Sequence, residues 1–229
     1  MIEHEQTTLE QCGENFKEEL FQAARLKSKE VVQTLFKKLR PGLLEKEIVE
    51  LIDQELFAQN AQRLWHPTKV RIEKNTVKSF PEKFDEIKTL EPGDLIFFDI
   101  GPVFEGHEGD YGETFIFHDS ETRSIANHHE KKQLVRFSKE LFKILKDEFH
   151  HQQLTGEALY KRAVELSAEV GLQFNLRMGG HRLGDFPHAI YSKAKLKDVE
   201  FVPMSGLWVL EIHLINPEVG LGAFFEDLI

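Results

Sequence analysis

The sequence has almost no cysteine: Cys12 is its single cysteine in 229 residues. One cysteine cannot form a disulfide within the chain, and by itself it cannot build a thiolate metal site. No apolar run approaches the roughly 18 residues of a membrane span, and no secretory-type apolar stretch opens the chain. We therefore expect a cytoplasmic protein, with no membrane partner, whose chemistry relies on oxygen and imidazole groups.

Positive charge is also scarce, since 29 Lys and Arg residues face 39 Asp and Glu residues and give a net charge of −10. This sign is wrong for binding a polyanion, so we expect no nucleic acid partner. Hydrophobic residues make up 41% of the chain, and no linker or low-complexity segment divides it. We therefore predict one folded domain over residues 1–229.

The hydrophobic periodicity predicts paired helices and strands in each half of the chain. In the first half, helices are predicted at about 14–39 and 44–56, an extended segment at 70–77, and strands at 95–100 and 113–117. In the second half, helices are predicted at about 124–149 and 155–171, and strands at 207–215 and 223–228. Gly42 and Gly156 each open a helix containing Val-Glu-Leu, which indicates a duplication with halves of about 1–118 and 119–229.

Carboxylates interrupt the most apolar predicted strands. Asp99 ends the run LIFFD, and a hairpin across the following glycine-rich turn would bring Asp110 back beside it. Glu211 lies within LWVLEIHLI, and Glu226 lies within GAFFEDLI. A buried ionised carboxylate is costly unless a cation or hydrogen-bond donors compensate it. Pairing of these acids with Lys or Arg is one solution, and convergence on a shared site is the other.

The segment MGGHRLGDFPHA combines glycines, which let the backbone approach a ligand, with His181 and His188. Carboxylates with an imidazole form a hard donor set that suits Mn²⁺, Fe²⁺, Co²⁺ or Zn²⁺. His213 shares a strand face with Glu211, so it faces either the site or a neighbouring helix. Three further residues are candidates for the pocket wall by position: Trp65, His66 and Phe186.

The segments FDIGPVFEGHEGDYGETF, GGHRLGDFPHA, WVLEI and FFEDLI occur in this order, after RPGLLEKEI. Together they resemble the pita-bread metallopeptidase superfamily of methionine aminopeptidase, aminopeptidase P, prolidase and creatinase. The resemblance covers most of the chain and is closest to a short, single-domain member like aminopeptidase P. It implies an α+β fold in which two pseudo-symmetric α/β halves surround a curved, mainly antiparallel sheet.

The resemblance also implies two divalent metal ions and the residues that hold them. Asp99 would bind one ion, while His181 and Glu211 would bind the other. Asp110 and Glu226 would bridge both ions. Manganese, cobalt, iron and zinc all suit such a set.

The implied activity is that of an aminopeptidase that removes the N-terminal residue of short peptides, Xaa-Pro or similar. Hydroxide generated at the dinuclear centre would attack the amide, with Glu211 as proton acceptor. His188 would contact the substrate and donate a hydrogen bond to the developing oxyanion, and His213 is a second candidate for substrate contact from its strand face alone. Two alternatives stay open: hydrolysis of a non-peptide C–N bond in a small amide, and a non-catalytic peptide-binding module. Homodimer formation is also left open.

The chain departs from the superfamily in three places. No histidine occurs within residues 75–89, where relatives carry a substrate-contacting imidazole, and His66 lies further back. The residues after Asp110 read Tyr-Gly-Glu-Thr, without the usual Thr and Arg before the final Thr. Glu211 is not followed by the usual proline, and its interval to Glu226 is short. Substrate handling is therefore the least defined part of the prediction.

Overall fold

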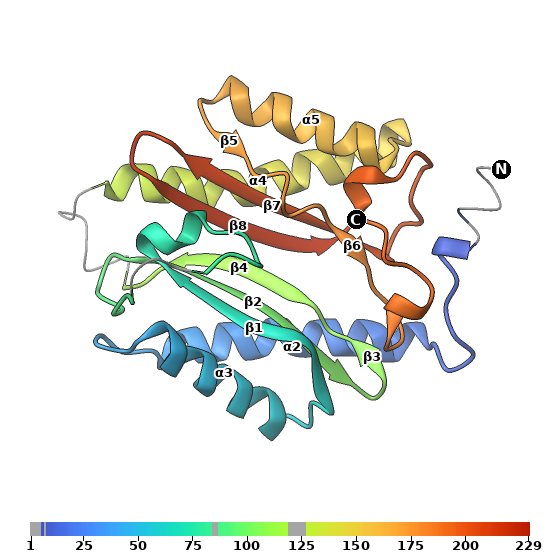
Figure 1. Ribbon diagram of the computed structural model, residues 1–229, viewed down its shortest axis with the longest axis horizontal. Coiled ribbons are helices and arrows are strands. Elements are labelled where there is room, and N and C mark those ends of the chain that lie inside the picture. The colour runs from blue at the N-terminus through green and yellow to red at the C-terminus, as the bar shows by residue number, and fades with distance from the viewer. Residues whose placement is uncertain (1–5, 7, 84–86, 119–126) are drawn as a thin grey trace.

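The computed structural model of the chain describes residues 6, 8–83, 87–118 and 127–229. Its strands form one eight-stranded sheet with the order β1-β2-β4-β8-β7-β5, to which β3 adds beside β2 and β6 beside β7 (Figure 1). All of the pairings are antiparallel. The predicted α+β class with a mainly antiparallel sheet is confirmed.

The two halves of the chain repeat one arrangement: a long helix, a shorter helix, an outer strand and a hairpin. The first half comprises α2 (Glu18–Lys38), α3 (Glu45–Ala58), β1 (Arg63–Ile72), η1 (Glu73–Val77), β2 (Leu95–Phe104), β3 (His107–Glu108) and β4 (Tyr111–Ile116). The second half comprises α4 (His128–Gln152), α5 (Gly156–Glu169), β5 (Gln173–Phe174), β6 (His181–Arg182), η3 (His188–Ile190), η4 (Leu196–Asp198), β7 (Trp208–Asn216) and β8 (Leu221–Leu228). The halves join where β4 pairs with β8, in the middle of the sheet.

Each half buries its own apolar core between its helices and its strands. One cluster joins the apolar faces of α2 and α3 to β1 and β2, and the other joins α4 and α5 to β7 and β8. Every residue of β2 is buried, because this strand lies inside the sheet and is covered on both faces. The helices of both halves cover the same face of the sheet, since Phe36 on α2 and Lys139 on α4 both contact the Phe115 ring on β4. The opposite face carries Asp99.

The strands differ from their predicted bounds at two places. The second strand continues through Gly101 and Pro102 to Phe104, because its end still pairs with β1 and β3. The extended segment predicted at 70–77 is instead the end of β1 followed by the 3₁₀ helix η1. The first strand begins before Pro67, and register shifts on both sides of His66 accommodate this proline, which cannot donate a ladder hydrogen bond.

The predicted helices match the structure closely where it describes them. The helix predicted at 124–149 corresponds to α4, although its first residues, 124–126, lie outside the described residues. Among the helices of the described ranges, none combines the length and the apolar character needed to cross a lipid bilayer.

The core of the first half provides a direct stability test on one helix. Leu35 and Leu26 both lie on α2, but Leu35 is 4% exposed and Leu26 is 60% exposed. We expect Leu35→Ala to lower the free energy of unfolding by about 2–5 kcal/mol, since it leaves a cavity in the core. The matched Leu26→Ala should change it by about 0.5 kcal/mol or less. Urea denaturation measures both, and equal losses would contradict the packing described here.

Candidate metal centre

Three of the predicted acids lie in one row across the sheet. Asp99 on β2 pairs with Gly112 on β4, which pairs in turn with Glu226 on β8. Glu226 also pairs with Glu211 on β7. Side chains of directly paired residues project to the same face, so the row gathers three carboxylates. Gly112 leaves the space between them, because a Cβ there would lie 2.7 Å from Glu226 Oε1.

Asp110 and His181 complete this cluster from outside the row. Asp110 immediately precedes β4, and its carbonyl oxygen accepts a hydrogen bond of 2.9 Å from Arg25 Nη1. His181 lies on β6, and its Nε2 is 3.1 Å from Asp110 Oδ2. The structure therefore brings all five predicted ligands to one cavity of about 370 Å³.

His66 also reaches this cavity, although its distance in the sequence argued against it. Its Nε2 lies 3.0 Å from Asp110 Oδ1 and 3.4 Å from Asp99 Oδ1. The reason is the pairing of β1 with β2, which places His66 opposite Gly101, just beyond Asp99. Only the register of that strand pair would have identified His66 from the sequence.

In the described part of the chain, the acids of the cluster form no ion pair with Lys or Arg. The ion pairs of Asp99 and Asp110 are with His66 and His181 alone, and neither Glu211 nor Glu226 forms one. Glu226 Oε1 is buried without any hydrogen-bond partner. The alternative to a shared site was pairing of each acid with Lys or Arg. The described residues do not provide such pairs.

Burial favours the protonated forms of Asp99, Glu211 and Glu226. It raises the pKa of Asp99 to about 7, although the nearby His66 opposes the shift. It also raises the pKa of Glu211, and with help from the Asp110 charge it raises that of Glu226 well above its ordinary value. Acids crowded in this way are stabilised in their charged form by positive charge among them.

Asp110 lies at the centre of the cluster. Burial alone would raise its pKa, but His181 and His66 outweigh that effect and lower it. Its carboxylate belongs to two groups whose ligand atoms lie within 4.8 Å of one another: His66, Asp99 and Asp110, and Asp110, His181 and Glu226. The donors, the orphaned Glu226 oxygen and the excess of buried acid all fit divalent cations.

His188 lines the same cavity and is held by a residue that the sequence did not single out. Its Nδ1 is 2.7 Å from Glu108 Oε2, and its backbone N–H donates to Glu108 Oε1 at 3.1 Å. Because an ionised carboxylate only accepts, Nδ1 carries the proton and Nε2 remains for a bound molecule. Glu108 lies in a two-residue strand inside a glycine-rich turn, where no local pattern marks it.

The structure does not bring His213 to the cavity. Its Nε2 is 2.7 Å from the Thr76 carbonyl oxygen and its Nδ1 is 3.1 Å from Asn175 Nδ2, so both ring nitrogens are engaged. Of the three pocket-wall candidates, Trp65 and His66 line the cavity. Phe186 does not, and its ring packs instead against the Arg63 guanidinium.

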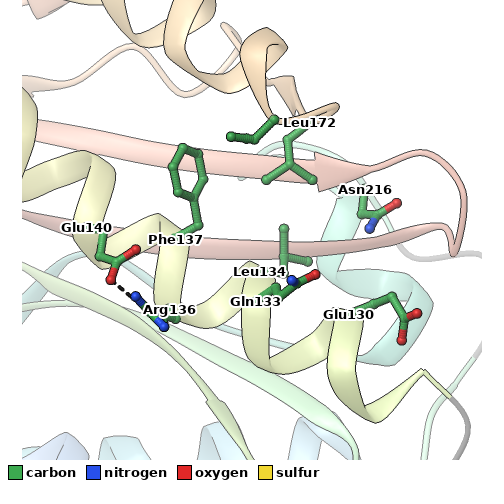
Figure 2. Close-up of a pocket in the computed structure, with 9 residues that line it drawn as sticks. Glu130, Gln133, Leu134, Arg136, Phe137, Glu140, Leu172 and Asn216 are labelled. Atoms are coloured by element: carbon green, nitrogen blue, oxygen red, sulfur yellow. Dashed lines mark hydrogen bonds and ion pairs between the residues drawn. The ribbon is translucent and has the colours of Figure 1, made fainter.

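A second hollow of about 360 Å³ lies between α4, the end of α5 and β7. Figure 2 shows Leu134, Phe137 and Leu172 gathered there, with an ion pair of 2.6 Å between Arg136 and Glu140. Its lining contains no histidine. The cavity that combines histidines with carboxylates is therefore the one around Asp110.

Comparison with known proteins agrees with this geometry. A model of metallopeptidase family M24 matches residues 19–229. An X-Pro aminopeptidase from Thermotoga maritima has a similar structure, with a TM-score of 0.73, 18% identity, and coverage of 99% of this chain and 60% of that chain. A prolidase from Pyrococcus horikoshii gives a TM-score of 0.69 at 17% identity, over 92% of this chain and 58% of that chain.

A methionine aminopeptidase from Thermotoga maritima gives a TM-score of 0.67 at 16% identity, over 93% of this chain and 91% of that chain. The chain thus spans about 60% of the length of the X-Pro aminopeptidase but nearly the whole methionine aminopeptidase. At these identities the likeness shows the fold, which is the expected pita-bread fold. No curated protein matches the chain by sequence.

The acidic cluster predicts how metal affects stability. Adding Mn²⁺ or Co²⁺ to metal-free protein should raise its unfolding midpoint. A ligand that binds the folded state and is present at 100 times its Kd adds about 2.7 kcal/mol to the free energy of unfolding. Glu226→Gln should shrink this shift and, by removing one crowded carboxylate, raise the midpoint of the metal-free protein.

The exposed Glu200 supplies the control, since Glu200→Gln should leave both midpoints unchanged. Differential scanning calorimetry with and without metal measures each variant. Equal metal shifts for Glu226→Gln and the unchanged chain would contradict the site.

Proposed function

The chain belongs to metallopeptidase family M24, and from this premise we propose that it is a metal-dependent aminopeptidase. It removes the N-terminal residue of short peptides, Xaa-Pro or similar. The observation that carries the proposal is the meeting of four carboxylates, three of them buried and Glu211 half-buried, with a histidine, from both halves of the chain, in one cavity. A cavity of this size admits a short peptide end but not a folded protein.

Two divalent ions, manganese, cobalt, iron or zinc, are the proposed cofactors. Asp99 would hold one ion, His181 and Glu211 would hold the other, and Asp110 and Glu226 would serve both. Bound at this place, the ions supply a water of lowered pKa and polarise the scissile carbonyl. The donor set and the orphaned Glu226 oxygen support this assignment.

The protein's own residues position the substrate and move its protons. His188 is held through Nδ1 by Glu108 and directs Nε2 into the cavity, from which the imidazolium form would donate to the negative charge that develops on the carbonyl oxygen. Glu211 Oε2 accepts the Gly180 N–H at 2.5 Å, which fixes its carboxylate. Glu211 then takes the proton of the attacking water and passes it to the leaving nitrogen. Trp65 and Met178 line the cavity and exclude bulk water.

The rival functions differ from this one in a measurable way. A non-catalytic peptide-binding module has no need for four crowded acids without a Lys or Arg ion pair among the described residues, so the chemistry of the cavity favours an enzyme. A hydrolase of a non-peptide C–N bond would use the same residues, and the substrate panel below separates it.

Peptide turnover tests the proposed activity. With Mn²⁺ or Co²⁺, we expect release of the first residue from at least one Xaa-Pro or Met-Xaa peptide. Chromatography of the products measures this release. His188→Ala should lower kcat by about 100-fold to 1,000-fold, the usual loss for one oxyanion donor.

His150→Ala is the matched control, because this histidine is exposed on α4, and it should keep full activity. Metal-loaded protein that cleaves none of the peptides would contradict an aminopeptidase. Turnover of small non-peptide amides under the same conditions would then support the rival hydrolase.

The mouth of the cavity suggests which peptides are preferred. Arg177, Lys193 and Lys195 line it and are exposed, although the whole protein is acidic. Arg177 forms an ion pair with Glu82 at 2.9 Å. The positive charge at the mouth of the cavity therefore comes mainly from the two lysines. Cations beside the cavity attract a substrate carboxylate, which lies close to the scissile bond only in very short peptides. We therefore expect dipeptides with a free C-terminus to be the best substrates.

Comparison of a dipeptide with its C-terminal amide tests this preference. The amide should have a kcat/KM lower by roughly 2-fold to 30-fold, since each of two exposed ion pairs contributes about 0.2–1 kcal/mol. The double variant Lys193→Ala/Lys195→Ala should lose the preference, and added salt should weaken it.

The double variant Lys46→Ala/Lys143→Ala removes two exposed lysines elsewhere and should retain the preference. Equal use of acid and amide by the unchanged chain would contradict the role of the cationic mouth, while leaving the aminopeptidase assignment intact.

A further inference from the structure

We propose that His66 is a sixth protein ligand of the metal centre, so that each of the two ions receives one imidazole. This inference rests on the proposed metal function and extends it beyond the five residues that the family resemblance supplies. His66 would share one ion with Asp99, Asp110 and Glu226, and His181 would share the other with Asp110, Glu211 and Glu226.

The hydrogen bonding of the His66 ring fixes which nitrogen is available. Its Nδ1 lies 3.0 Å from the Pro67 carbonyl oxygen, and a carbonyl only accepts, so Nδ1 carries a proton. In the neutral ring, Nε2 then presents a lone pair. A histidine that binds a metal has this arrangement, in which its other nitrogen donates to a carbonyl or carboxylate.

The lone pair of Nε2 points at acceptors rather than donors. Asp110 Oδ1 is 3.0 Å away and Asp99 Oδ1 is 3.4 Å away. Three lone-pair donors at these distances repel one another unless a proton or a cation lies between them. The three ligand atoms lie within 4.8 Å of one another, which is the spacing that a shared ion requires.

His181 shows the same arrangement on the other oxygen of Asp110. Its Nδ1 is 3.1 Å from the Arg182 carbonyl oxygen, and its Nε2 is 3.1 Å from Asp110 Oδ2. The two imidazoles therefore flank one carboxylate in equivalent ways. Since His181 is an expected ligand, its equivalent geometry supports the same role for His66.

The surroundings hold the His66 ring in this place. It enters at a register shift of β1 and packs between Trp65 and Phe80, with ring centroids 4.3 Å and 5.2 Å away. The neighbouring strand β2 leaves room for the ring at Gly101, where a Cβ would lie 2.3 Å from His66 Cδ2. The ring is only 10% exposed, so it is not a surface histidine that happens to face the cavity.

Metal binding to the full chain tests the inference without reference to activity. Mn²⁺ or Co²⁺ titrated into metal-free protein should give two bound ions, by calorimetry and by elemental analysis after dialysis. His66→Ala should weaken the affinity for one ion by about 10-fold to 100-fold and leave the affinity for the other ion unchanged. Gly101→Ala, which displaces the ring without removing it, should weaken the same ion.

His188→Ala is the matched control, because this imidazole lines the cavity but faces Glu108, and it should keep both ions. X-ray absorption of the Co²⁺ protein should give about one imidazole per ion, falling to about half in His66→Ala when both ions are forced on by excess metal. Two ions bound by His66→Ala and Gly101→Ala with unchanged affinity would overturn the inference. Absence of metal binding by the unchanged chain would instead overturn the proposed function itself.

Discussion

The crowding of four carboxylates, three of them buried and Glu211 half-buried, is the constraint on which the rest of the structure depends. Such a cluster is unfavourable by itself, because burial and mutual repulsion both oppose ionisation. The fold nevertheless imposes it, through a register that lines up Asp99, Glu226 and Glu211 across four strands. Helices from both halves pack on the opposite face of the sheet, and divalent cations among the acids would relieve the repulsion that this register creates.

The site also explains why two similar halves make one functional unit. Asp99 and Asp110 come from the first half, while His181, Glu211 and Glu226 come from the second. They meet only because β4 pairs with β8 at the centre of the sheet. Metal binding and the joining of the halves are therefore coupled, and each should stabilise the other.

The sequence by itself indicated two similar α/β halves and the conspicuous acids, because these signals are local, and the resemblance to a known superfamily supplied the fold class. An acid inside an apolar strand is conspicuous in the sequence, as at Glu226, whereas the roles of His66 and Glu108 depend on contacts between distant segments. His66 reaches the cavity through a β1–β2 register with two shifts around Pro67, which no periodicity reveals. His213 does share the strand face of Glu211, but it lies about 7 Å further along the strand, where η1 covers that face through Thr76.

The most direct test of the account is a crystal structure of the metal-loaded protein with anomalous difference maps at the absorption edge of the added metal. The account predicts two peaks about 3.5–4 Å apart, the separation usual in two-metal sites, with Asp110 and Glu226 between them. A cluster without anomalous density, or with ions bound elsewhere on the protein, would contradict it.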